Sequence, residues 1–244
     1  MLLLTMKFRR NKMKLLLENW RKYLNEMEEP ITTLRIFDFD ETIAHTMSET
    51  RVKAPDGTET TVRNQQEFEE YMNAAAAKEG VEAFDAVDAL IELGYQIDMS
   101  DFSIVKDPAE IIIVTDMLKA FPENSKTYIL TARRGTSIGP ILDYLDEIGV
   151  DSSQVRVMAT QGESKGDVMV AMMKNKIMDN GKSNINFIEY YEDSEKNIKD
   201  VQMKVCNNKE LEQIKPEDFE LVIHKVVGFD VGNDREYKIE TLGC

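Results

Sequence analysis

Two pairs of carboxylates are the first feature of this sequence that could do chemistry. Asp38 and Asp40 lie in the run Asp38-Phe39-Asp40-Glu41-Thr42, and the pair Glu192-Asp193 follows much later in the chain. Closely spaced carboxylates bind divalent cations and also serve as nucleophiles or general acids. The two pairs therefore predict a cation site, provided that the fold brings them together.

The elements that must position these residues are strands that end where the polar residues begin. The predicted strands are residues 34–37, 127–130 and 185–191. The first ends at Asp38, the second at Thr131 and the third just before Glu192, while Lys165 opens a predicted helix. The carboxyl ends of strands in an open α/β sheet meet at one crevice, so we expect these residues to share a site.

Helices alternate with strands through the same region. The predicted helices are residues 111–121, 139–148 and 165–177, and a further strand is predicted at residues 155–158. This alternation is typical of βαβ units around a parallel sheet. The fold class that we predict is α/β, with a Rossmann-like parallel sheet and helices on both of its faces.

Two regions do not follow the alternation. Residues 43–110 contain a turn at Pro55-Asp56-Gly57, a predicted helix at residues 65–78 and a polar connection, and we expect an insertion over the strand ends. Residues 206–244 form a predicted C-terminal extension, in which residues 220–227 are the one predicted strand and a polar tail follows.

Composition excludes several classes of protein. The 244 residues include 30 basic and 45 acidic side chains, a net charge of -15, which excludes a uniformly basic protein that coats nucleic acid. Two cysteines exclude a disulfide framework and a cysteine-based zinc site. No apolar run approaches the roughly 20 residues of a membrane span. We therefore expect a soluble cytoplasmic protein.

The four features together resemble the motifs of the haloacid dehalogenase-like (HAD) superfamily of phosphotransferases. The first motif is similar to Asp38-Phe39-Asp40-Glu41-Thr42, the second to the strand that ends at Thr131, the third to Lys165 and the fourth to Glu192-Asp193. The resemblance covers residues 34–205. It implies a Rossmann-like core at residues 30–42 and 111–205, with residues 43–110 as a small cap inserted after the first strand.

The resemblance also implies roles for these residues. Asp38 would be the nucleophile and a Mg²⁺ ligand, and Asp193 would be the distant carboxylate ligand. Asp40 would bind the ion through its backbone carbonyl, protonate the leaving oxygen and then activate water. Thr131 and Lys165 would hold the phosphoryl oxygens. Family members that cleave carbon–halogen bonds lack the second acid, so Asp40 favours phosphoester chemistry.

The other candidate residues have supporting roles, and two interpretations stay open for Glu192 and for His45. Glu192 could bind the metal through water or brace Lys165. Thr42 and Arg133 are predicted to contact substrate, and Asn197 is predicted to orient the metal-binding loop. His45 lies either at a cap hinge or on the surface.

The N-terminal residues 1–29 form a predicted basic amphipathic helix. Residues 1–23 carry seven basic side chains and one acidic side chain. Such a helix either packs on the domain or docks a protein partner. The segment also resembles the capsid-targeting leaders of tailed bacteriophages, with Leu24-Asn25-Glu26 similar to a prohead protease site.

The function that we predict is Mg²⁺-dependent hydrolysis of a phosphomonoester through an aspartyl-phosphate. The run Leu130-Thr131-Ala132-Arg133 is similar to phosphatases encoded by bacteriophages and to their polynucleotide-phosphatase relatives. The expected substrate is thus a nucleotide or the 3'-phosphate end of a nucleic acid, in the host cytoplasm or a virion. Transfer to an acceptor other than water stays open, as does a non-enzymatic protein of virion or scaffold that retains the HAD fold.

Overall fold

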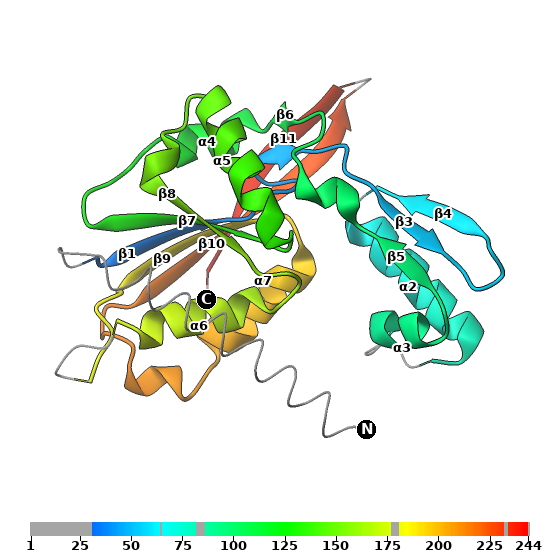
Figure 1. Ribbon diagram of the computed structural model, residues 1–244. Coiled ribbons are helices and arrows are strands. Elements are labelled where there is room, and N and C mark those ends of the chain that lie inside the picture. Colours follow the sequence, from blue (N-terminus) through cyan, green and yellow to red (C-terminus); the bar gives the residue numbers. More distant parts are fainter. Residues whose placement is uncertain (1–30, 64, 82–85, 177–180, 232–233, 244) are drawn as a thin grey trace.

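The structure is a computed structural model that describes residues 31–63, 65–81, 86–176, 181–231 and 234–243 (Figure 1). The predicted helix at residues 1–29 lies outside the described residues. Among the described residues, no helix has the length and apolar composition that crossing a membrane requires.

A six-stranded sheet forms the centre of the molecule. Its strands, in spatial order, are β11 (Asp234–Gly243), β10 (Glu220–Val231), β9 (Phe187–Glu192), β1 (Thr33–Phe37), β7 (Ser125–Thr131) and β8 (Val155–Ala159). All neighbours pair in parallel except β10 and β11. The fold is therefore α/β with a mostly parallel sheet, as the alternation of helices and strands predicts.

The register of the sheet makes its central strands end together. Phe37 at the end of β1 lies beside Ile129 of β7 and Tyr191 of β9. The backbone N–H of Asp38 continues this ladder by donating to the carbonyl of Tyr191 at 2.9 Å. Residues that follow the three strands therefore emerge side by side.

Helices cover both faces of the sheet (Figure 1). One face carries α4 (Ile112–Leu118) and α5 (Ile138–Glu147), and the other carries α6 (Lys165–Lys174) and α7 (Glu195–Val201). Strand β1 is buried between the two layers because its side chains alternate between them. Ile36 packs in the apolar cluster with α6 and α7, and Phe37 packs in the cluster with α4 and α5.

Residues 50–98, which lie between β1 and α4 in the sequence, form a separate layer beside the sheet. We call this layer the outer module. Its elements are β3 (Thr50–Lys53), β4 (Glu59–Val62), α2 (Gln65–Glu79), α3 (Ala86–Glu92) and β5 (Gln96–Asp98). The module has an apolar core of its own, which includes Val52, Met72 and Leu90. In Figure 1 it lies beyond the end of the sheet where the central strands terminate.

Two connections join the outer module to the sheet. The outgoing connection contains β2 (Ala44–His45) and the returning one contains β6 (Ala109–Glu110), and these two short strands pair antiparallel. Met47 also donates its N–H to the Lys106 carbonyl at 3.0 Å. The two connections thus lie side by side at the edge of the sheet.

Several single turns complete the chain. Turns of 3-10 helix lie at Ser100–Ser103, Gly135–Ser137, Ser152–Gln154 and Leu211–Gln213, and a π-helical turn at Gln202–Cys206 continues α7. The predicted turn at Pro55-Asp56-Gly57 is confirmed, with Gly57 at φ 89° between β3 and β4. Helix α4 is shorter at both ends than predicted, because the chain begins it only after β6 and turns at 119–124.

The prediction of a polar C-terminal tail is wrong. Strand β10 continues to Val231, and the chain returns as β11, which pairs with it along its whole length. Tyr237 and Ile239 of β11 pack against the apolar cluster under α4, and the alternating residues Glu236 and Lys238 are exposed. The exposed charged residues of this alternation lower the mean hydropathy of the segment, and for this reason the strand was not predicted from the sequence.

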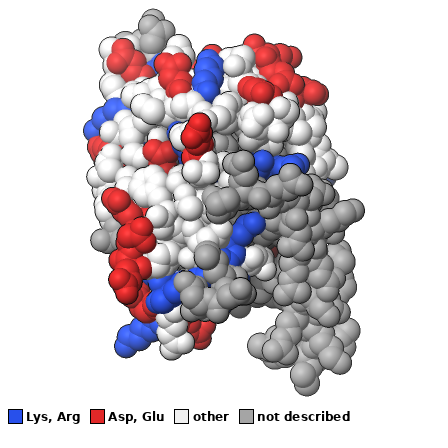
Figure 2. All heavy atoms as spheres, turned by 90° about the vertical axis from the view of Figure 1, so that its left-hand side faces the viewer, with Lys and Arg blue, Asp and Glu red and all other residues white. Residues whose placement is uncertain are grey.

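Charge is unevenly spread over the surface. Figure 2 shows the side of the molecule that Figure 1 places on the left, away from the outer module. Where described residues are visible there, acidic side chains gather toward the edges and basic ones lie scattered between them. That visible part therefore offers no broad basic surface for a polyanion.

Candidate functional site

Three carboxylates come together where the central strands end. Asp38 follows β1, Glu192 ends β9 and Asp193 comes next, and oxygen atoms of all three lie within 4.8 Å of one another. Asp38 and Glu192 are buried and Asp193 is partly buried. Their arrangement follows from the register of β1 and β9, which brings two distant carboxylate motifs to one edge.

Lys165 lies between two of these carboxylates. Its Nζ is 2.7 Å from Oδ1 of Asp38 and 2.7 Å from Oε2 of Glu192, and its side chain is 3% exposed. Both readings of Glu192 thus have a geometric basis, because it braces Lys165 and also belongs to the carboxylate cluster. Tyr190 donates a further hydrogen bond to Glu192.

The start of α6 fixes the position of Lys165. Ser164 caps the helix by accepting from the N–H of Asp167 at 3.0 Å and donates its own hydroxyl to Asp200 at 2.6 Å. The N–H of Gly166 also donates to Asp200, at 3.0 Å. A Cβ at Gly166 would lie 2.9 Å from the Cβ of Lys204, so the close approach of α6 to α7 requires glycine there.

Burial and mutual repulsion perturb the acids of this cluster. Burial and the neighbouring Glu192 raise the pKa of Asp38 to about 8, although Lys165 opposes this. The same two causes, burial and repulsion by Glu192 and Asp38, raise the pKa of Asp193 well above its ordinary value. Burial also acts against ionisation of Glu192, but Lys165 holds its pKa below the ordinary range.

The charges of the cluster do not balance. Three carboxylates face one buried ammonium group, and buried charges are costly unless they are paired. Carboxylate oxygens are the ligands that hard divalent cations prefer. The donor set thus fits a divalent cation, which would relieve the repulsion that raises the pKa of Asp38 and Asp193.

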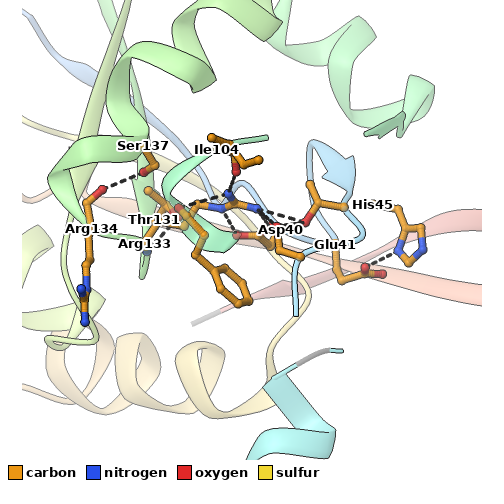
Figure 3. Close-up of polar contacts among 11 residues, drawn as sticks. Asp40, Glu41, His45, Ile104, Thr131, Arg133, Arg134 and Ser137 are labelled. Carbon is orange, nitrogen blue, oxygen red and sulfur yellow. Dashed lines mark hydrogen bonds and ion pairs between the residues drawn. The ribbon is translucent and has the colours of Figure 1, made fainter. Parts of the chain in front are cut away.

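A second polar group surrounds Asp40, two residues after Asp38 of the cluster (Figure 3). Arg133 holds Asp40 through both carboxylate oxygens, with Nε 2.8 Å from Oδ2 and Nη2 2.6 Å from Oδ1. Thr46 donates to the same Oδ1 at 2.9 Å. The Arg133 side chain is only 1% exposed, whereas that of Asp40 is 29% exposed. In this structure Arg133 is thus turned to Asp40 rather than open to a substrate.

The remaining predicted residues have varied surroundings. Thr42 is buried, and its hydroxyl donates to Oδ1 of Asp193 at 3.4 Å, so it faces a carboxylate of the cluster. Thr131 is buried, and its Oγ1 accepts from the N–H of Arg133 at 3.2 Å. Asn197 lies in the first turn of α7 and makes no side-chain hydrogen bond to the described part of the chain.

Sequence reasoning missed the surroundings of Glu41. This residue has a left-handed backbone, with φ 58°, between Asp40 and Thr42. Its carboxylate contacts His45, lies 3.1 Å from Nη2 of Arg235 and accepts from the hydroxyl of Tyr237 at 3.4 Å. His45 is thus one-third exposed beside the site rather than free on the surface. The alternation of Tyr237 and Ile239 with charged residues could have indicated β11, the strand that supplies Arg235 and Tyr237.

Comparisons with known proteins add no identification. No family model matches the chain, and no curated protein or solved structure matches it either.

Proposed function

We propose that this protein is a HAD-like phosphatase, a Mg²⁺-dependent hydrolase of phosphomonoesters. In this proposal the α/β core is Rossmann-like and residues 43–110 are a small cap. The observation that carries the proposal is the convergence of Asp38, Lys165, Glu192 and Asp193 at the strand ends, with Asp40 two residues away. No single motif in the sequence would support the chemistry alone.

The first step would form an aspartyl-phosphate. An Oδ of Asp38 attacks phosphorus, the bond from phosphorus to the leaving oxygen breaks, and that oxygen takes a proton from Asp40. Lys165 and Thr131 would hold the phosphoryl oxygens. Asp38, Asp193 and the backbone carbonyl of Asp40 would hold Mg²⁺, which when bound neutralises charge on the nucleophile and the phosphate. Glu192 would keep Lys165 in place.

The second step would release phosphate. Asp40, now ionised, accepts a proton from water, and the water oxygen attacks the phosphorus of the aspartyl-phosphate. The bond between phosphorus and Asp38 breaks, which restores the Asp38 carboxylate and protonated Asp40. Splitting the hydrolysis in this way replaces one difficult displacement by two easier ones.

The substrate that we propose is a nucleotide or the 3'-phosphate end of a nucleic acid. The net charge of -15 disfavours long polyanions and favours a small nucleoside monophosphate. The position of the outer module beyond the strand ends also supports a small substrate, because a large one would have to pass beside it (Figure 1).

The test is phosphate release from nucleoside 5'- and 3'-monophosphates, 3'-phosphorylated oligonucleotides and sugar phosphates, with and without Mg²⁺. We expect turnover that needs the metal and that Asp38→Asn abolishes. Asp116→Asn, an exposed aspartate on α4, is the matched control and should keep full activity. An added acceptor alcohol would reveal transfer to groups other than water.

The opposite outcome is equally clear. If the folded wild-type protein and Asp38→Asn are equally inert across the panel with Mg²⁺ present, the phosphatase proposal is wrong for these substrates. A non-enzymatic interaction protein that retains the fold would then be the better hypothesis.

A further inference from the structure

Arg133 is a buried cation that meets Asp40 and both connections of the outer module. Its Nη2 donates to the hydroxyls of Thr46 at 3.0 Å and Ser48 at 3.1 Å, on the outgoing connection. Its Nη1 donates to the carbonyl of Phe102 at 3.3 Å and to that of Ile104, on the returning connection. One side chain therefore joins residues 40–48 to residues 102–104, which are distant from each other and from Arg133 in the sequence.

The guanidinium group has no capacity left for another ligand. Its five N–H groups face six acceptors, which are the two oxygens of Asp40, the two hydroxyls and the two carbonyls, and Nη2 shares its two hydrogens among three of them. It also packs over the rings of Phe39 and Phe102, at 5.3 and 5.1 Å from their centroids. A substrate phosphate could reach Arg133 only by displacing these partners.

The geometry of this contact links Asp40 to the connections. An arginine side chain presents its donors in a rigid planar fork, so its partners must keep a fixed arrangement relative to one another. Thr46 connects the outgoing connection to both side chains, since its hydroxyl accepts a hydrogen bond from Arg133 and donates one to Asp40. If either connection moved, the fork would lose acceptors and the carboxylate of Asp40 would lose its orientation.

We propose that Arg133 is a positioning residue that couples the position of the outer module relative to the sheet to the orientation of Asp40. Asp40 then protonates the leaving oxygen efficiently only when both connections are in place. This inference rests on the proposed function, because it takes Asp40 as the general acid. It goes beyond that function by assigning Arg133 to Asp40 and the connections instead of to the substrate.

The test uses substrates that differ in their need for a proton. The p-nitrophenolate ion leaves without protonation, whereas the alkoxide of a nucleoside requires it. In Arg133→Lys, we expect kcat/KM for a nucleoside monophosphate to fall by about 10²-fold and that for p-nitrophenyl phosphate by less than about 10-fold, since a general acid contributes about 10²- to 10⁴-fold.

Arg35→Lys is the matched control. Arg35 is also a buried arginine, paired with Glu189 at 2.7 Å and donating to the carbonyls of Met117 and Ala120 from within β1. Its replacement should lower the melting temperature and change both kcat/KM values by the same factor. If Arg133→Lys also changes both values equally, Arg133 has only a structural role and the inference is overturned.

Hydrogen exchange provides a readout that does not need activity. The N–H of Met47 is bonded to the Lys106 carbonyl and so reports on the pairing of the connections. We expect faster exchange of this amide in Arg133→Lys but not in Arg35→Lys, and unchanged exchange would overturn the coupling. Should Arg133→Lys fail to fold, Thr46→Val removes the link from Thr46 to Asp40 and should show the same substrate dependence to a smaller degree.

The two proposals fail in different ways. If the wild-type protein hydrolyses neither substrate, the proposed function fails and the role of Asp40 in this inference fails with it. If the wild-type protein is active and Arg133→Lys shows no preference between the substrates, the proposed function stands and the inference alone is wrong.

Discussion

Replacing Asp193 by asparagine should make the metal-free protein more stable and should remove most of the stabilisation that Mg²⁺ provides. Asp193 lies with Asp38 and Glu192 in the carboxylate cluster, and burial and their repulsion raise its pKa well above the ordinary value. An acid with a raised pKa in the folded state makes the protein less stable as pH rises from its unfolded pKa through its folded pKa. In the metal-free protein, Asp193→Asn removes this loss and should be stabilising at pH 8.

The stabilisation of the metal-free variant and the stabilisation of the wild-type protein by Mg²⁺ can both be estimated. Each unit by which the fold raises the pKa costs about 1.4 kcal/mol when Asp193 is ionised. One such unit corresponds to a rise of about 3–6 °C in the melting temperature of the metal-free variant. For the wild-type protein, Mg²⁺ at about 100 times its Kd should stabilise by about 2.7 kcal/mol, or about 5–11 °C. Asp193→Asn lacks a carboxylate ligand, so its shift should be below about 2 °C at the same concentration.

Thermal unfolding followed by circular dichroism, at pH 5 and pH 8 with Mg²⁺ or with EDTA, measures both effects. The stabilisation of the metal-free variant should be larger at pH 8 than at pH 5. Asp40→Asn is the matched control, because Asp40 is proposed to bind the ion through its backbone carbonyl, and it should keep the Mg²⁺ shift. A full Mg²⁺ shift in Asp193→Asn, or a lower melting temperature of this variant in EDTA at pH 8, would refute the reasoning.

Two further predictions concern stability away from the cluster. Burial acts against ionisation of Glu189, but hydrogen bonds from His224 and Arg35 lower its pKa to about 2. The contribution of this ionised carboxylate to stability is therefore complete above pH 4.5 and is lost as the pH falls toward 2. Urea titrations should show that Glu189→Gln costs about 3 kcal/mol at pH 7 and far less near pH 2; an equal cost at both pH values would contradict this. Gly166→Ala should cost about 1–3 kcal/mol by overpacking the α6–α7 contact, whereas Gly139→Ala, with no atom within 4 Å of the added Cβ, should cost nothing in the same titrations.

The residues of the carboxylate cluster were predictable because local signals mark them. A strand that is buried on both faces appears as an apolar run, and the polar residue that ends it lies at the edge of the sheet. Asp38 and Glu192 both follow this rule, and Lys165, which contacts both, was found from the start of a helix. Their convergence then needs only the parallel order of the strands, which the alternation of helices and strands predicts.

The contacts of Arg133 were not predictable in the same way. Its position directly after the Thr131 strand favours substrate contact, because that loop borders the crevice. Its observed partners lie on both connections of the outer module, and their placement depends on how the module packs rather than on any local pattern. Exposed and buried arginines have the same sequence signature, so only tertiary structure distinguishes them.

The C-terminal hairpin shows how a region without motif residues can support a site. Gly228 of β10 leaves the space that the side chains of Arg235 and Tyr237 occupy, since a Cβ there would lie 2.8 Å from Nε of Arg235. Both side chains reach Glu41, whose left-handed backbone is unfavourable for a residue other than glycine and needs such contacts to persist. Glu41 lies within the turn that carries Asp38 and Asp40. The strand that local hydropathy hides therefore helps to hold the turn from which the proposed chemistry starts.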